Sequence, residues 1–222
     1  MELLINSLLF VHVTAGVLTL LAGPAAILSN TNQLRWHRLS GKVFFFAMLV
    51  TCFSSILTYF RHPEKIFYQF LLGIAFVVLG GLLRGVRAVT IMKNGRPGVF
   101  DFLYTLLLGI TGTWMLYMAV TLFMEGTGIA FPILFGVFGG GAVHDALKNF
   151  HIFSGKKMMS GTDWLQLHLN SMIGAFIAST TAFTVNTAHY LPWFVQWFGP
   201  TVLLVPVMVW FSKKIKAGRA FG

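Results

Sequence analysis

Seven long apolar segments constrain this chain more than any other feature. They cover residues 4–28, 41–60, 66–90, 102–124, 128–148, 164–188 and 194–212, with short polar breaks between them. Each is close to the ~20 residues that a helix needs to cross a hydrocarbon core. Strands without partners would leave backbone groups unsatisfied in lipid, so we expect helices. The sequence predicts an all-α integral membrane protein with seven transmembrane helices, forming one polytopic domain over residues 1–222.

The composition agrees with this class. Hydrophobic residues make up 56% of the chain and charged residues 10%, and the mean hydropathy is +0.77. Soluble domains carry about 25% charged residues. The formal net charge of +10 is spread over several short loops, which favours a lipid bilayer and not nucleic acid as the partner. The single cysteine, Cys52, excludes an intramolecular disulfide and a cysteine-based metal motif.

The distribution of Lys and Arg predicts the orientation. With the amino terminus outside, all of the 16 basic residues except Arg61 and Lys65 fall on the cytoplasmic side. An odd number of spans then places the carboxy terminus in the cytoplasm. We expect a multi-pass protein of the bacterial inner membrane.

Two of the apolar segments carry a histidine on a face of small residues. His144 follows Gly136 and Gly140 at helical spacing, and His168 begins a stripe of small and polar side chains. Rise per residue places His144 roughly 6 Å inside the cytoplasmic helix end and His168 at a similar depth. His37 precedes the second segment on the same membrane side, with Arg38 beside it. These three histidines are therefore expected to converge.

The side chains that are expected to converge with these histidines suit two kinds of cofactor. His37, His144 and His168 with Asp145 match the ligands of zinc or another divalent metal. Two facing histidines, such as His144 and His168, suit the axial positions of haem b equally well. The alternative is structural, because a histidine near a helix end can snorkel or hydrogen-bond to a neighbouring helix.

Two further groups are candidates for ligand binding. His12 lies roughly 12 Å below the outer face and could belong to a second site, with His62 or His189 as partners; otherwise it makes an interhelical hydrogen bond. Arg84, with Arg87 one turn later, could attract a haem propionate or an anionic headgroup. Anchoring by the positive-inside rule is the simpler explanation for both arginines.

Three short motifs carry a resemblance to known proteins. V-H-V-T-A-G near the start, W-H-R-L-S-G-K before the second segment, and W-L-Q-L-H-L-N-S-M later resemble a family of uncharacterised bacterial multi-pass membrane proteins, a domain of unknown function. The matching positions are His12, Gly16, His37, Arg38, Gly41, Trp164 and His168. H-x3-G followed by H-R-x2-G is also similar to cytochrome b561-type and ferric-reductase-type haem proteins. That similarity implies histidines on several helices that hold haem.

These observations leave three functional hypotheses. The first is a haem b protein in membrane electron transfer, with a quinone or another membrane redox partner, for which the candidate residues are His12, His37, Arg38, Arg84, His144 and His168. The second is a zinc-dependent intramembrane hydrolase that uses the same histidines to activate water. The third is a membrane subunit or small-solute carrier without enzymatic activity, in which the histidines only hydrogen-bond between helices.

Overall fold

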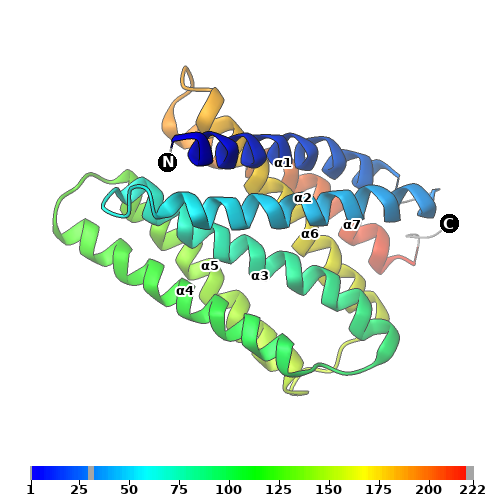
Figure 1. Ribbon diagram of the computed structural model, residues 1–222. Coiled ribbons are helices and arrows are strands. Elements are labelled where there is room, and N and C mark those ends of the chain that lie inside the picture. Colours follow the sequence, from blue (N-terminus) through cyan, green and yellow to red (C-terminus); the bar gives the residue numbers. More distant parts are fainter. Residues whose placement is uncertain (1, 30–32, 219–222) are drawn as a thin grey trace. The chain divides into compact units, whose positions relative to one another are not determined.

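The regular secondary structure of the described residues is entirely α-helical. The computed structural model describes residues 2–29 and 33–218, and the elements in those ranges are all α-helices (Figure 1). They are α1 (Glu2–Leu28), α2 (Leu34–Tyr59), α3 (Ile66–Asn94), α4 (Val99–Met124), α5 (Ala130–Phe153), α6 (Gly161–Thr187) and α7 (Trp193–Lys216). The all-α class and the order of the seven helices are confirmed.

Six of the described helices are long and apolar enough to cross a membrane. The protein is therefore a multi-pass helical membrane protein. The exception among the described helices is α6, which is 27 residues long but carries polar side chains such as Gln166, His168 and Asn170 along its first half. Length alone would allow α6 to span the hydrocarbon core.

The second helix begins earlier than the hydrophobic pattern predicts. The apolar segment starts at residue 41, whereas α2 starts at Leu34. Residues 34–40 contain two Leu and two Arg, which are strong helix formers, so the helix continues beyond its apolar part into the interface. As a result, His37 and Arg38 lie on α2 and not in the preceding loop.

The chain divides into two compact units. The first contains the described parts of residues 1–54 and 161–222, with α1, most of α2, α6 and α7, and the second contains residues 55–160, with the end of α2, α3, α4 and α5.

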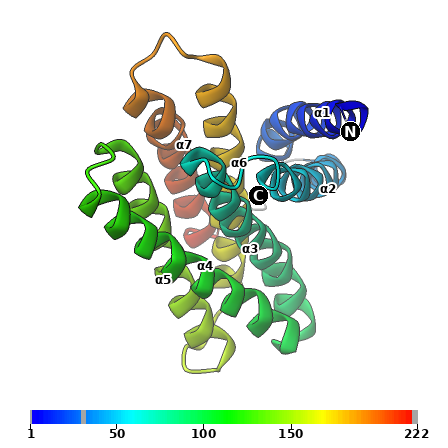
Figure 2. The ribbon, with the colours of Figure 1, turned by 60° about the vertical axis from the view of Figure 1, so that its left-hand side comes forward.

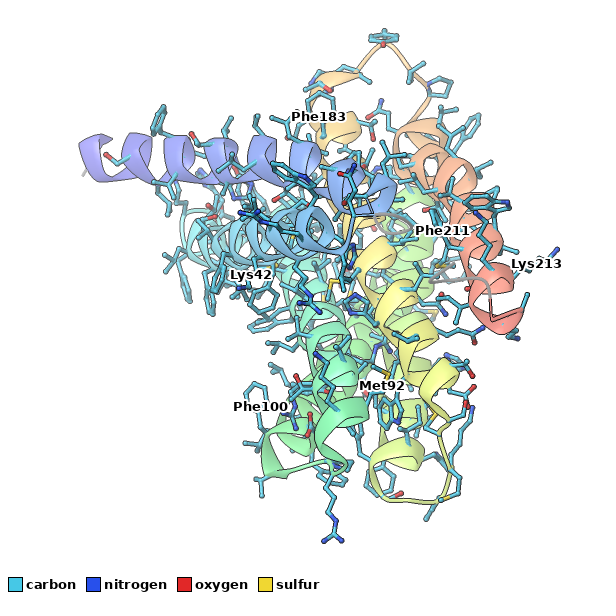
Figure 3. The ribbon with its side chains drawn as sticks, turned by 90° about the vertical axis from the view of Figure 1, so that its right-hand side faces the viewer. Lys42, Met92, Phe100, Phe183, Phe211 and Lys213 are labelled. Carbon is cyan, nitrogen blue, oxygen red and sulfur yellow. The ribbon has the colours of Figure 1, made fainter. Side chains whose placement is uncertain are left out.

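In the first unit, polar side chains join α6 to α7. Gln166 Nε2 donates to the backbone oxygen of Ser212 (3.3 Å), and Thr184 Oγ1 donates to that of Gln196 (2.8 Å). The later residue of α6, Thr184, bonds to the earlier residue of α7, Gln196, so the two helices are antiparallel. Figure 3 shows them side by side, with Phe183 near the loop that joins them and Lys213 near the far end of α7. The polar stripe of α6 is thus partly used in packing.

In the second unit, α4 and α5 form a closely packed antiparallel pair (Figure 2). A Cβ atom on Gly112 would lie 2.8 Å from the backbone nitrogen of Val143, and one on Gly139 would lie 2.9 Å from the oxygen of Gly112. Such contacts require glycine on both helices. The glycines on the face of His144 do not make this contact: an added Cβ would lie 3.8 Å from Ala119 Cβ at Gly136 and would meet no atom within 4 Å at Gly140.

Candidate cofactor site

His37 and His168 are neighbours in the first unit. Their ring centroids lie 6.4 Å apart, with the ring planes at 76° to each other. His37 is in the first turn of α2, and His168 is in the third turn of α6. Both side chains are half-buried. Two of the three predicted histidines are therefore brought together.

A third helix holds the ring of His37 in place. His37 Nδ1 lies 2.9 Å from the backbone oxygen of Ala26 in α1. Because a carbonyl can only accept, Nδ1 carries the hydrogen and donates it. In a neutral imidazole held in this way, Nε2 is the nitrogen left to bind a metal. Histidine ligands of metals usually have such a backbone or carboxylate acceptor on the other nitrogen.

Below the imidazole pair, aromatic side chains pack between the same three helices. Phe176 of α6 lies 6.4 Å from Phe44 of α2, ring centroid to ring centroid, and its ring packs directly on Gly23 of α1. Gly41 lies one turn from His37 on the same face of α2. An added Cβ at Gly41 would meet no atom within 4 Å, so this position on α2 faces open space.

His144 and Asp145 belong to the second unit. The His144 side chain is 76% exposed, and its Nδ1 lies 3.7 Å from Asp145 Oδ1. The other carboxylate oxygen of Asp145 forms an ion pair with Arg84 Nη1 at 2.7 Å. Within residues 2–29 and 33–218, no three His, Cys, Asp or Glu side chains are grouped closely enough to hold a metal ion.

His12 has a hydrogen-bond partner on another helix. Its Nδ1 lies 2.8 Å from Ser54 Oγ, which joins α1 to α2. This is the interhelical bond that the sequence suggested as the alternative to a second ligand site. Ser54 was not identified as the partner, because one serine in an apolar segment gives no signal of what it faces. Of the suggested outer partners, His62 pairs with Glu64 at 3.4 Å in the second unit, and His189 is exposed in the loop after α6.

The remaining predicted ligands are basic. Arg38 is exposed next to His37. Arg84 is 7% exposed in the second unit, where it pairs with Asp145. Arg87 forms two bonds to the carboxylate of Asp101, Nε to Oδ1 (2.7 Å) and Nη2 to Oδ2 (2.6 Å). Both arginines of α3 thus have carboxylate partners within their own unit, and the sequence reasoning missed both pairs.

The chain was compared with known proteins in three ways. No family model, no curated protein and no solved structure matches it. Its function is therefore inferred from the chemistry of the site.

Proposed function

We propose that this multi-pass membrane protein binds haem b through His37 and His168 and transfers electrons in the membrane. The observation that carries the proposal is the pairing of these two imidazoles between α2 and α6, 6.4 Å apart. His37 and His168 would hold the haem, which would supply the redox chemistry when bound. A quinone or another membrane carrier is the proposed redox partner.

The number of paired histidines favours haem over zinc. Haem b can be held by two histidines, and the described residues bring two together, His37 and His168. Zinc takes three or four protein ligands as a rule.

Three features of the first unit support the proposal further. The bond from His37 Nδ1 to Ala26 fixes the ring orientation and raises the basicity of Nε2. Open space at Gly41 leaves room for a flat ligand beside the imidazoles. Arg38 supplies a positive charge near the same helix end, which suits a haem propionate.

The proposal is tested by absorbance and iron content of the full chain, purified in detergent from cells that make haem. We expect a Soret band, reduced α and β bands, and iron bound stoichiometrically. His37→Ala and His168→Ala should each remove most of the haem. His144→Ala and His189→Ala are the matched controls and should retain it.

Two results would contradict this assignment. A protein without a Soret band or iron would end the haem proposal. Loss of haem in His144→Ala, with haem retained in His37→Ala, would contradict His37 as a ligand.

The proposal also includes the arrangement in the membrane. We infer seven spans, with the amino terminus outside and the carboxy terminus in the cytoplasm of a bacterial inner membrane. The support is the excess of Lys and Arg in the loops that this orientation places inside. His37 and His168 would then lie in the cytoplasmic half of the membrane.

A further inference from the structure

A cluster of charged and polar side chains fills the space between α3, α4 and α5 in the second unit. Its two ion pairs, Arg84 with Asp145 and Arg87 with Asp101, contribute two positive and two negative charges. The cluster is therefore neutral in total and has no excess charge to attract an ion. Asp101 is fully buried, and Arg84 is 7% exposed.

Two polar atoms in this cluster lack a partner. Among the described residues, Asn149 Nδ2 has no hydrogen-bond partner, and Tyr104 Oη lies beside the Asp101 carboxylate without a hydrogen bond of good geometry. Tyr104 is 4% exposed and Asn149 is 0% exposed. The rings of Phe100 and Phe153 enclose Tyr104, with centroids 5.7 and 6.0 Å from its own.

Both unpartnered atoms lie on residues that face Arg84. Asn149 Oδ1 accepts from Arg84 Nη1 at 3.5 Å, which places the amide at the guanidinium. Tyr104 follows Asp101 by three residues on one face of α4, and Arg84 precedes Arg87 by three residues on α3. Arg87 of α3 pairs with Asp101 of α4, and the two helices are antiparallel. Tyr104, one turn after Asp101, therefore lies at the same height along the helix pair as Arg84, one turn before Arg87.

Leaving a buried polar atom without a hydrogen bond costs about 1–3 kcal/mol, so such atoms are normally satisfied. A group that satisfies these atoms must contain an oxygen that accepts from the Asn149 amide. It must be neutral, because the charges already balance, and small, because the side chains are almost completely enclosed. Water meets these three conditions and usually bonds to about three buried polar groups.

We propose that the second unit contains an internal water-binding site bounded by Arg84, Tyr104 and Asn149. Water there accepts from Asn149 Nδ2, bonds to Tyr104 Oη and donates to a carboxylate of the ion pairs. The site is independent of the proposed haem site, which lies in the other unit.

Hydroxyl-radical footprinting by X-ray radiolysis of the full chain in detergent tests this site. Radicals formed from a bound water modify the side chain beside it, even when bulk solvent cannot reach it. We expect Tyr104 to be modified several times faster than Phe135, which is equally enclosed in the same unit at 0% exposure. Equal, near-zero modification of both residues would overturn the proposal.

Two variants separate bound water from chance opening of the helices. Asn149→Leu removes one partner of the water and should reduce modification of Tyr104 to the level of Phe135. Thr105→Val is the matched control, because it removes a buried hydroxyl that already donates to the backbone oxygen of Asp101 at 2.7 Å. It should leave the modification of Tyr104 unchanged. An equal decrease in the modification of Tyr104 in both variants would contradict a water held by Asn149.

The sign of a stability change gives a second, independent test. If Tyr104 Oη bonds to water, Tyr104→Phe removes that bond and lowers the melting temperature. A hydroxyl that is truly unsatisfied would give the opposite result, because deleting it relieves a penalty. A higher melting temperature for Tyr104→Phe would therefore also overturn the proposal.

Discussion

At the scale of single residues, the second unit shows how charged side chains are accommodated in membrane-spanning helices. Asp101 accepts two bonds from Arg87 and a third from the backbone nitrogen of Gly98 at 2.8 Å. The last bond caps α4, since it satisfies a backbone donor at the start of the helix. An isolated charge in this environment would be costly, and pairing removes most of that cost.

Breaking this pair should destabilise the protein strongly. Asp101→Asn leaves the Arg87 guanidinium without its counter-charge. We expect a loss of about 3 kcal/mol, at the lower end of the range for buried pairs because 27% of the Arg87 side chain is exposed. Unfolding of the purified protein in detergent measures the change.

The control is the double variant Arg87→Met with Asp101→Asn, which removes both charges and should recover much of the stability. If Asp101→Asn alone has no effect, the pair makes no net contribution.

The bond from His12 to Ser54 should make only a small contribution. Hydrogen bonds between transmembrane helices contribute about 1 kcal/mol, so His12→Ala and Ser54→Ala should each lower the stability by that amount. The double variant should lose no more than either single variant, and haem content should stay constant. Loss of haem in His12→Ala would instead indicate a second cofactor site near the outer face.

At the scale of helices, glycine position decides which faces come together. Gly112 and Gly139 lie at the crossing of α4 and α5, where backbone atoms approach within a distance that no side chain would allow. Gly140 is only one residue further along α5 but faces open space. A step of one residue turns the helix by about 100°, which is enough to exchange a packed face for an open one.

Alanine substitutions at these glycines should have opposite effects. Gly112→Ala and Gly139→Ala force the helices apart and should cost about 1–3 kcal/mol, as overpacking does elsewhere. Gly140→Ala meets no neighbour and should stabilise α5 by about 0.5–1 kcal/mol through helix propensity. Thermal unfolding of the three variants gives the comparison. A destabilising Gly140→Ala would show that this face is covered in the folded protein.

The space beside His37 can be tested in the same way. Gly41→Leu should lower haem content while both imidazoles remain, because the new side chain occupies the space proposed for the ligand. Gly16→Leu is the matched control, since an added Cβ at Gly16 in α1 would also meet nothing within 4 Å. The ratio of haem absorbance to protein measures the effect. Equal haem content in the two variants would place the ligand elsewhere.

At the scale of the whole molecule, α6 decides the topology. The other six described helices qualify as membrane spans by length and hydropathy, whereas α6 does not. If α6 also spans, the two termini lie on opposite sides of the membrane. If it does not, the number of spans is even and the termini lie on the same side.

Reporter fusions to the two ends of the full chain give a direct answer. We expect the carboxy-terminal fusion to be active as a cytoplasmic reporter and the amino-terminal fusion to be active only as a periplasmic one. The reason is the positive-inside distribution, which leaves only Arg61 and Lys65 outside. Reporters on one side would mean that α6 does not cross the membrane.

The sequence alone determined the class of this protein and the approximate place of each helix. Both follow from local properties, since an apolar run of sufficient length must form a helix in lipid wherever it packs. The sequence also indicated His37 and His168 as candidate ligands, because imidazoles near helix ends stand out in an apolar chain.

Only the tertiary structure decided which side chains meet. It placed His37 beside His168 and bonded it to Ala26, paired Arg84 with Asp145, and brought Gly139 against Gly112 at the crossing of α4 and α5. Helical periodicity shows which residues share a face, but the partner of that face depends on the rotation and packing of the neighbouring helices. Those are properties of the folded chain as a whole.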